Sequence, residues 1–390
     1  MAEAQRLILG RAQQLPPETV PLERAAGRIL AEPAAAVVDL PPFPSSAMDG
    51  YAVRAADTPG RLRIAGRIAA GKPAPVGLES GQAMEISTGG VVPSGADAVI
   101  PIEYVVEHDN EVESESIEPG ANVRPRGGDI RAGEAVADRG SVLTPARLGA
   151  LAAAGVPEVR CTRRPRAAVL ATGTELRNPG EPLEPGEIYE ANGLILSAQV
   201  EAAGAFAEWI PAVGDDEGEL RAALEGALAA DVVVTSGGVS VGPHDLVRRV
   251  EAELGVEEVF WRVAVKPGKP IAFGVRGGTL VFGLPGNPVS ALVGFELFVK
   301  PAIRALQGAL EPLPRFERGR LSGVRQRNPE RDELVRARLR RSEDGPLLEP
   351  LSGQESHMIA RSADADALLL VQRGEGELAD GASVDYLPLR

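Results

Sequence analysis

The sequence predicts an α/β fold in which a doubly wound, mostly parallel sheet lies between smaller β-rich domains. Two observations support this prediction. Between residues 166 and 308, apolar runs of strand length alternate with helical segments, as in right-handed βαβ units. On both sides of that stretch, short apolar runs are broken by many glycines and prolines, and 390 residues suffice for roughly two to four domains.

The N-terminal zone is predicted to hold two small domains. We assign residues 17–131 to a β-rich N-terminal domain, because its apolar runs are short and are separated by turn residues. Residues 1–16 and 132–165 are assigned to a linking helical and β domain. The helix in TPARLGALAAAG is predicted to have Thr144 as N-cap and Pro145 at its first position, and to end at Gly155.

Residues 166–308 form the predicted α/β domain. Its expected strands are RAAVLATG, AFAEWIPAV, DVVVTSGG, FWRVAV and TLVFG. Its expected helices are NGLILSAQVEAAG, EGELRAALEGALAA, HDLVRRVEAELG and NPVSALVGFELFVKPAIRAL. Asn192 is the expected cap of the first helix, and Asn287 is that of the last, with Pro288 at its first position. In residues 309–390 short alternating runs return, which predicts a C-terminal β-barrel-like domain.

Composition and charge exclude several classes of protein. The net charge of −14 argues against non-specific binding to nucleic acid or to an anionic membrane surface, since both need a basic face. No apolar run approaches ~20 residues and the N-terminus has no signal-peptide pattern, so we expect a cytoplasmic protein. The single cysteine, Cys161, excludes an internal disulfide and a cysteine-based zinc site.

Two loops of the predicted sheet suit an anionic ligand, because parallel sheets bind ligands at the carboxyl ends of their strands. Gly237, Gly238 and Ser240 in TSGGVSVG offer backbone amides and a hydroxyl before a helix start, which suits phosphate. The loop is neither a Walker A motif nor GxGxxG, so nucleotide binding by those motifs loses support. The alternative is an ordinary glycine-rich loop without a ligand.

The second loop, LPGNPVS, places Asn287, Pro288 and Ser290 at a sharp turn into a helix. The alternative interpretation is a well-capped helix that binds nothing. A shared site is favoured because this loop and the first one belong to the same predicted sheet.

Acidic side chains follow other strands of the same sheet. Glu175, Asp215 and Asp245 all lie in loops on the predicted ligand side. Three such carboxylates would repel one another unless a hard cation lay between them, and Mg²⁺ with phosphate oxygens fits that description. Each acid alone could instead be a favourable charge at a helix N-terminus.

Lysine is rare in this chain. Of the 41 lysines and arginines only four are lysine, and Lys266 and Lys269 lie three residues apart in KPGKP. Two prolines and a glycine stiffen this turn, and lysine provides a compact point charge that suits a small oxyanion or a phosphate. The alternative is a solvated turn.

The N-terminal zone adds three further candidates. Asp49 lies in SSAMDGYAV, for which the alternative interpretation is a simple Asp-Gly turn. Thr88 lies in a second tight glycine-containing loop, ISTGGVVPSG, and Asp129 lies close to two arginines in RPRGGDI.

Seven stretches occur in the order found in one known family. They are SSAMDGYAV, STGGVVPSGADAVIP, GGDI, ATGTEL, SGGVSVG, KPGKP and GLPGNPVSA. Together they resemble the molybdopterin molybdenumtransferases, the MoeA and gephyrin E-like proteins, over essentially the whole chain. This resemblance implies an elongated homodimer with four subdomains. It also implies an enzyme that inserts molybdate into adenylylated molybdopterin, with Mg²⁺ assistance and release of AMP.

The resemblance implies roles for individual residues. The positions that match catalytic residues are Asp49, Asp245, Lys266 and Lys269. The positions that match acidic metal ligands are Glu175, Asp215 and Asp245. The positions that match substrate contacts are Thr88, Asp129, Gly237, Gly238, Ser240, Asn287, Pro288, Ser290, Arg336 and Ser356. One departure is YEANG, where Glu190 stands in place of the aspartate that is more frequent in the family.

Two other functions stay open at this point. The adenylyltransferase that makes the activated pterin shares the α/β domain, but it is a single short domain with a Gly-Gly-Thr-Gly loop. A non-catalytic gephyrin-like scaffold is the other alternative, although this chain shows no long linker or appended domain. For the enzyme, the expected partners are the pterin, molybdate, a second copy of the chain and the adenylyltransferase that hands over the adenylate, with no nucleic acid and no membrane.

Overall fold

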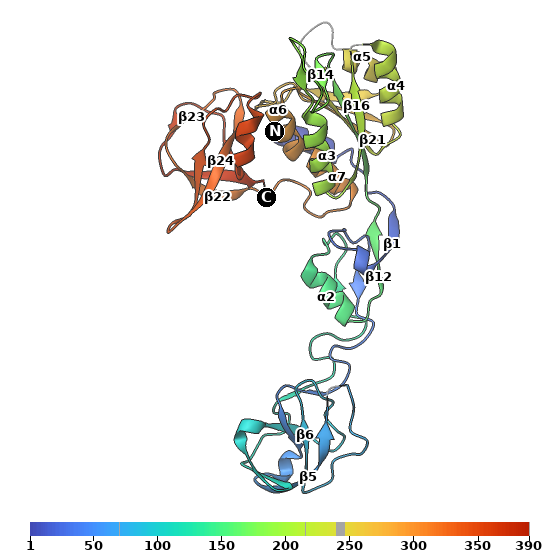
Figure 1. Ribbon diagram of the computed structural model, residues 1–390, viewed down its shortest axis with the longest axis vertical. Helices are drawn as coiled ribbons and strands as arrows, with labels where there is room; N and C mark the ends of the chain where they lie inside the picture. The colour runs from blue at the N-terminus through green and yellow to red at the C-terminus, as the bar shows by residue number, and fades with distance from the viewer. Residues whose placement is uncertain (70, 215, 239–245, 390) are drawn as a thin grey trace. The chain divides into compact units, whose positions relative to one another are not determined.

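The computed structural model describes every residue except 70, 215, 239–245 and 390 (Figure 1). It divides the chain into two compact units. The first unit holds Met1–Glu18 and Thr162–Arg390, and the second unit holds Thr19–Cys161. Within the described ranges, no helix has the length and the apolar composition that crossing a bilayer requires.

A six-stranded sheet forms the centre of the α/β domain in the first unit. Its strands lie in the order β16 (Phe206–Val213), β13 (Arg166–Thr172), β17 (Val232–Ser236), β21 (Thr279–Leu284), β20 (Ala272–Arg276) and β18 (Glu257–Trp261). The pairs β13–β16, β13–β17 and β17–β21 are parallel, whereas β20 is antiparallel to both of its neighbours. The mostly parallel sheet is confirmed, and β20 is a strand that the sequence analysis did not include.

Helices cover both faces of this sheet, as a doubly wound fold requires. One face carries α4 (Glu217–Ala227) and α5 (Leu246–Glu253), and the other carries α3 (Asn192–Ala202), α6 (Pro288–Gly294) and α7 (Lys300–Leu306). Along β13, Val169 packs with α3, α6 and α7, and the next residue, Leu170, packs with α4 and α5. Because both faces are buried, the strands have continuous apolar runs.

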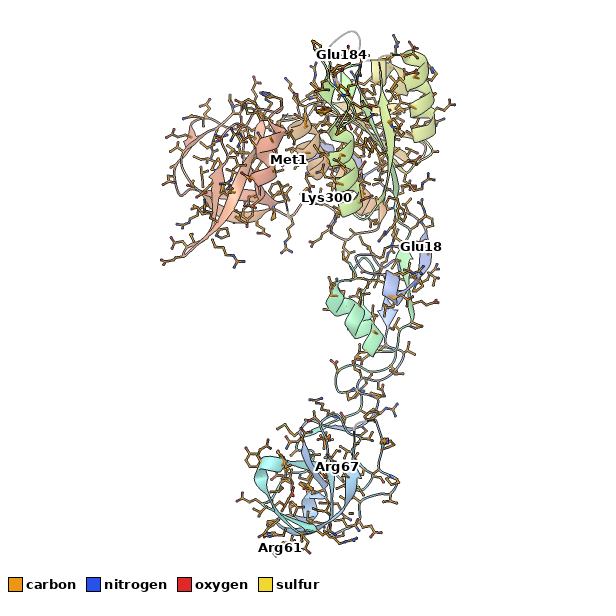
Figure 2. All side chains as sticks on the ribbon, in the orientation of Figure 1. Met1, Glu18, Arg61, Arg67, Glu184 and Lys300 are labelled. Carbon is orange, nitrogen blue, oxygen red and sulfur yellow. The ribbon has the colours of Figure 1, made fainter. Side chains whose placement is uncertain are left out.

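The N-terminal helix α1 (Ala2–Leu9) belongs to the first unit, whereas the sequence analysis assigned residues 1–16 to the linking domain. Ala4 and Ile8 are buried in the same core as α7, and Met1 packs against that core (Figure 2). The apolar positions of a short helix do not specify which domain they pack against, so this assignment required the tertiary structure.

The helix predicted over residues 287–306 is divided by a π-helical segment, Phe295–Val299, between α6 and α7. Pro301 has no N–H group to donate to the carbonyl oxygen of Leu297, four residues earlier. The side chain of Gln5 in α1 donates to this oxygen at 3.0 Å instead. The contact therefore joins α1 to the α/β domain at a carbonyl oxygen whose ordinary helical donor is missing.

The run FWRVAV, predicted as one strand, is divided in the structure. Strand β18 ends at Trp261, and Arg262 adopts a φ of 76°, a left-handed conformation that interrupts a strand. The chain then forms a two-residue strand, β19 (Val265–Lys266), which pairs in parallel with β24 of the C-terminal domain. The prediction of a single strand is wrong because the end of the run pairs with the sheet of the C-terminal domain.

The C-terminal domain is a closed five-stranded barrel, as predicted. Its strands are β22 (Glu317–Leu321), β24 (Asp332–Ser342), β25 (Gly345–Pro350), β26 (Ala367–Val371) and β28 (Ser383–Pro388). They lie in the order β24-β25-β22-β28-β26, and pairing of β26 with β24 closes the barrel. Outside the barrel, β23 (Arg325–Gln326) pairs with β27 (Glu377–Leu378). Alternate residues of the barrel strands, such as Val335, Leu369 and Tyr386, fill the interior of the barrel.

The second unit is β-rich, as expected. Its main sheet has the order β7 (Ala98–Pro101), β4 (Gly50–Val53), β6 (Gln82–Ile86), β5 (Gly60–Ile68), β9 (Glu111–Ser114) and β8 (Val105–His108). Shorter pairs join β1 (Pro17–Pro21) with β12 (Glu158–Thr162), β2 (Ala34–Ala35) with β11 (Ala135–Ala137), and β3 (Ser45–Ser46) with β10 (Val123–Arg124). Helix α2 (Pro145–Ala153) begins as predicted, since the side chain of Thr144 accepts from the amide of Arg147.

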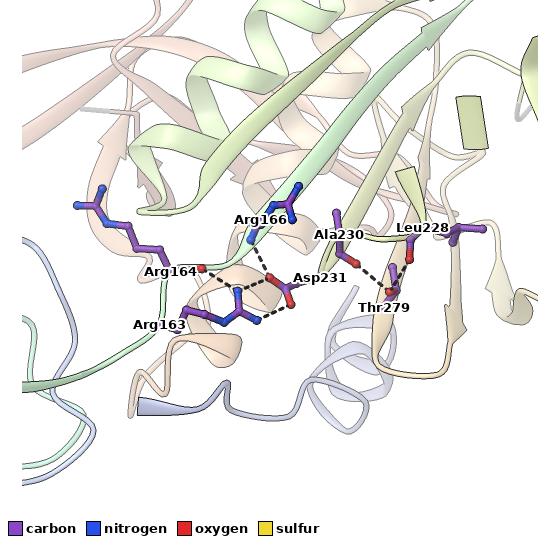
Figure 3. Close-up of polar contacts among 7 residues, drawn as sticks. All are labelled: Arg163, Arg164, Arg166, Leu228, Ala230, Asp231 and Thr279. Carbon is purple, nitrogen blue, oxygen red and sulfur yellow. Dashed lines mark hydrogen bonds and ion pairs between the residues drawn. The ribbon is translucent and has the colours of Figure 1, made fainter. Parts of the chain in front are cut away.

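Polar contacts hold the amino ends of the central strands together (Figure 3). Before β13, Arg163 donates through both terminal nitrogens to the carboxylate of Asp231 at 2.8 and 2.9 Å. The amide of Arg166 donates to the same carboxylate at 2.8 Å. Thr279, at the start of β21, donates to two carbonyl oxygens in the segment before β17. These contacts lie at the edge of the sheet opposite to the predicted ligand loops.

Candidate functional site

A cavity of about 380 Å³ lies at the carboxyl ends of β13, β17 and β21. It is lined by the ends of these strands, by the two predicted ligand loops and by the segment after β13. Three of the predicted site residues, Glu175, Gly238 and Asn287, line it. Its size and its mixed polar and apolar lining are typical of a small-molecule site at the edge of a parallel sheet.

Asn192 lies in the wall of this cavity and connects three segments. Its Nδ2 donates to Ser236 Oγ at 2.8 Å and to the carbonyl oxygen of Gly286 at 2.7 Å. Ser236 in turn donates to the carbonyl oxygen of Pro285 at 3.3 Å. The prediction that Asn192 caps α3 is wrong, because Asn192 is the first residue of the helix and its side chain bonds to the ends of other segments. The carboxylate of Glu190 instead accepts from the amide of Gly193 at 2.8 Å.

The glycines of the first loop are required by their backbone geometry. Gly237 and Gly238 have φ values of 99° and 64°. A Cβ atom on Gly237 would lie 2.5 Å from the carbonyl oxygen of Thr172, and one on Gly238 would lie 2.3 Å from Val247 Cγ2. The amide of Gly237 donates to the carbonyl oxygen of Leu284, so this N–H extends the sheet instead of facing a ligand. The predicted Ser240 lies outside the described residues.

Another part of the cavity wall is apolar. Leu176 of β14 (Leu176–Arg177) and Ile188 of β15 (Ile188–Tyr189) line it, and these two short strands pair in parallel. An ion pair between Arg177 and Glu187 joins the same two segments. The cavity therefore has a polar wall formed by strand ends and an apolar wall beside it, an arrangement that suits a flat heterocycle with hydrogen-bonding edges.

Of the three predicted acidic ligands, Glu175 is the one that the structure describes. Its carboxylate folds back over Gly173, where a Cβ atom would lie 2.6 Å from Oε2, and it borders the cavity. Asp215 and Asp245 lie outside the described residues. Among the residues that are described, no three His, Cys, Asp or Glu side chains form a group that could hold a metal ion.

The lysine-containing turn lies between this cavity and the C-terminal barrel. Pro270 lines the 380 Å³ cavity, and the carbonyl oxygen of Ser290 lies 3.6 Å from where a Cβ atom on Gly268 would be. Lys266 Nζ lies 3.0 Å from Glu333 Oε1 of the barrel, and the side chain of Lys269 is exposed. Lys266 and Glu333 line a second, smaller cavity of about 140 Å³.

A polar link joins α6 to the barrel beside this turn. Asn287 Nδ2 donates to Ser356 Oγ at 2.9 Å, and the amide of Val289 donates to the carbonyl oxygen of Ser356 at 3.1 Å. Asn287 occupies the predicted N-cap position of α6, and Pro288 is the first residue of the helix, but the Asn287 side chain does not bond to the helix amides. Two predicted contact residues that are 69 positions apart in sequence are thus neighbours.

Arg336 has a different environment from the other predicted contacts. Its side chain is 1% exposed and donates to the carbonyl oxygens of Gly353 and Met358, both at 2.6 Å. Burial lowers the pKa of its guanidinium, although the nearby Glu355 favours the charged form. Arg336 therefore holds the segment that carries Ser356, and its direct contact with a substrate stays a prediction.

The remaining predicted residues lie in the second unit. The amide of Thr88 donates to Asp49 Oδ1 at 2.6 Å, so these two residues form one exposed group. Asp129 is exposed on another loop, where its amide donates to the carbonyl oxygen of Leu40. Their joint action with the first unit stays a prediction.

Models of protein families match three successive regions of the chain. Residues 1–155 match the MoeA N-terminal region (domain I and II). Residues 168–305 match a probable molybdopterin binding domain, and residues 318–389 match the MoeA C-terminal region (domain IV). The 380 Å³ cavity thus lies in the part that matches the molybdopterin binding domain.

Curated relatives and a solved structure agree with these matches. The chain is 41% identical over 329 residues to molybdopterin molybdenumtransferase 2 of Mycobacterium tuberculosis, covering 80% of each chain. It is 36% identical over 379 residues to molybdopterin molybdenumtransferase of Haemophilus influenzae, covering 95% of this chain and 93% of the relative. The crystal structure of a molybdopterin biosynthesis MoeA protein from Pyrococcus horikoshii superposes with a TM-score of 0.83 at 33% identity, covering 100% of this chain and 98% of that one.

Proposed function

This chain belongs to the MoeA family of molybdopterin molybdenumtransferases, and on that basis we propose that it inserts molybdenum into molybdopterin during synthesis of the molybdenum cofactor. The observation that carries this proposal is the cavity at the carboxyl edge of the sheet, which lies in the molybdopterin-binding region and borders the KPGKP turn. Matches to both flanking MoeA regions favour this activity over that of a single-domain adenylyltransferase.

Both reactants are anions, so the site must offset their mutual repulsion. Molybdate is a small dianion, and we propose that the ammonium groups of Lys266 and Lys269 bind it beside Ser290 and Ser356. The pterin would occupy the larger cavity, between Gly238, Asn287 and the apolar wall. Charge-assisted hydrogen bonds from lysine are well suited to oxyanions, and their position on a stiff turn limits the entropy lost on binding.

We further propose that the pterin arrives as its adenylate and that AMP leaves during the reaction. Mg²⁺ would polarise the phosphate oxygens and so favour departure of AMP. Carboxylate oxygens are the ligands that Mg²⁺ prefers, and Glu175 offers one at the cavity. Because the described residues contain no group of three ligands, the set would have to include the predicted Asp215 and Asp245.

The expectations about assembly and location also belong to this proposal. We propose that the chain acts as a cytoplasmic homodimer and that it receives the adenylate from the adenylyltransferase. Asp49, Thr88 and Asp129 would then contribute from the second unit, with Asp49 and Asp245 as catalytic residues. Sedimentation of the purified protein tests the dimer, and a monomer at micromolar concentration would contradict it.

The activity is tested by incubating the purified protein with adenylylated molybdopterin, Mg²⁺ and molybdate. We expect AMP to appear only when molybdate is present, which chromatography of the products measures. Absence of AMP under all conditions would refute the enzyme and favour the gephyrin-like scaffold. AMP that forms without molybdate would contradict the proposed coupling between molybdate insertion and AMP release.

Replacing Lys266 and Lys269 by alanine together tests the cationic turn. Loss of the charge-assisted contacts should raise the molybdate concentration for half-maximal rate by at least about tenfold, because even one such contact contributes about 1.5–3 kcal/mol. The matched control is Lys300→Ala. Lys300 also forms an ion pair, with Glu296 at 2.7 Å, but it lines a different cavity. An unchanged molybdate dependence in the double variant would contradict the assignment.

A further inference from the structure

The amide side chain of Asn192 has a fixed orientation. One of its partners, the carbonyl oxygen of Gly286, can only accept a hydrogen bond, so the atom that faces it at 2.7 Å must be Nδ2. The second Nδ2 hydrogen is directed to Ser236 Oγ at 2.8 Å. Both donors of the amide are therefore used within the protein, and a flipped side chain would place its oxygen against another oxygen.

The oxygen of the same amide has no partner in the described part of the chain. Asn192 is 8% exposed, and its Oδ1 is buried without a hydrogen bond to any of the residues that the structure describes. A buried acceptor without a partner costs free energy, and such groups are rare unless a ligand or a water satisfies them. Asn192 lines the 380 Å³ cavity, so a bound ligand is in a position to provide the missing donor.

The surroundings of Asn192 hold it in place. Its helix begins at the sheet edge because Glu190, 4% exposed, accepts from the amide of Gly193. A Cβ atom on Gly193 would lie 2.4 Å from Trp209 Nε1, so glycine is needed for this close approach to β16. Asn192 is thus anchored by α3, β17 and the loop before α6, and it lines a cavity that is also lined by apolar side chains.

We propose that Asn192 is a specificity-determining residue, whose Oδ1 accepts a hydrogen bond from a ring N–H or amino group of the pterin heterocycle. This inference rests on the proposed function, because it takes the occupant of the cavity to be a pterin. A site built around a fixed acceptor rejects an analogue that lacks the matching donor, since the acceptor is then left buried without a partner. The assignment extends substrate recognition to a residue of α3.

The test compares binding of three small probes to the full chain by equilibrium dialysis. The probes are pterin, 3-methylpterin, in which one ring N–H is blocked, and 4-oxopteridine, which lacks the exocyclic amino group. We expect the wild-type protein to bind pterin about tenfold more tightly than at least one of the other two probes, equivalent to about 1.4 kcal/mol. Asn192→Ala should bind all three with similar affinity.

Gln199 provides a matched control on the same helix. Its Nε2 donates to the carbonyl oxygen of Leu292 at 3.2 Å and to Glu296 at 3.0 Å. Its Oε1 is likewise buried without a partner among the described residues, and Gln199 does not line the cavity. Gln199→Ala should therefore keep the discrimination between probes. If Gln199→Ala loses it to the same degree as Asn192→Ala, the effect comes from the packing of α3 and the proposal is overturned.

A second variant covers the case in which Asn192→Ala does not fold. Asn192→Leu has nearly the same shape as asparagine and lacks the acceptor, so the folded variant should bind all three probes with similar affinity. Retention of the preference for pterin in folded Asn192→Ala or in folded Asn192→Leu overturns the proposal. Molybdate-dependent AMP release is measured in parallel: a wild-type protein that releases AMP but does not discriminate refutes the role of Asn192 alone. Absence of both AMP release and discrimination between the probes refutes the proposed function as well.

Discussion

Removal of the Asp231 carboxylate should destabilise the first unit by about 2–4 kcal/mol. Asp231 accepts two hydrogen bonds from Arg163 and one from the amide of Arg166, all at 2.8–2.9 Å (Figure 3). Hydrogen bonds to charged groups contribute about 1.5–3 kcal/mol each when buried. The side chains of Asp231 and Arg163 are 19% and 36% exposed, so solvent screening reduces the sum. Asp231→Ala also leaves Arg163 without its counter-charge.

Urea denaturation followed by tryptophan fluorescence measures this loss. Both tryptophans, Trp209 and Trp261, belong to the first unit, so the signal reports on that unit. The matched control is Arg166→Gln, which removes an exposed ion pair with Glu208 and keeps the Arg166 amide; it should cost less than about 1 kcal/mol. An Asp231→Ala variant as stable as this control would refute the reasoning.

The same contact makes a prediction for pH. Burial raises the pKa of Asp231, but the hydrogen bonds from Arg163 and from the Arg166 amide outweigh it, so the pKa lies below its ordinary value of 3.8. A depressed pKa in the folded state adds stability above the unfolded value, and this stability is lost as pH falls through the folded pKa. The difference in unfolding free energy between wild type and Asp231→Asn should therefore shrink below about pH 4. A difference that is constant down to pH 2 would contradict the assignment.

Three further substitutions test local packing. Gly193→Ala should cost about 1–3 kcal/mol and shift the fluorescence of Trp209, because the new Cβ would lie 2.4 Å from the indole nitrogen; an unchanged emission spectrum would contradict this. Gln5→Ala should cost about 1–3 kcal/mol in urea denaturation, since the carbonyl oxygen of Leu297 loses its donor, and equal stability would show that water replaces it. Thr144→Ala should cost about 1 kcal/mol and speed amide exchange in α2, and unchanged exchange would show that the cap is dispensable.

The parts of the fold that the sequence predicted correctly depend on local signals. Thr144 and Pro145 start α2, and Gly155 follows its end with a φ of 80°, because capping chemistry involves residues only a few positions apart. The α/β domain was predicted from the alternation of strands and helices in residues 166–308, and this pattern also depends on residues that are close together in the sequence. A Gly-Gly pair, Gly277–Gly278, also connects β20 to β21 as a two-residue hairpin, and it was the available signal for the antiparallel strand that the prediction lacked.

The parts that the sequence did not predict depend on distant partners. The side chain of Asn192 bonds to Ser236 and Gly286, which are 44 and 94 positions away, and these bonds override its local tendency to cap a helix. For the same reason Val265 and Lys266 pair with the barrel instead of extending β18. Among the site residues, Glu175, Gly238 and Asn287 were found from strand ends, whereas Asn192 was not, because the sequence does not show which acceptors surround it.

The pairing of β19 with β24 has a practical consequence for protein engineering. The sequence suggests that the chain could be divided in the proline-containing connection near residue 309. Such a cut would remove β24, the partner strand of Val265 and Lys266. It would also expose to solvent the apolar side chains through which the barrel shares a core with the α/β domain. Chimeras that exchange barrels among relatives would have to transplant β19 and the KPGKP turn together with the barrel. At this junction, the segment with β19 and the KPGKP turn and the barrel must therefore be exchanged together, although they are far apart in the sequence.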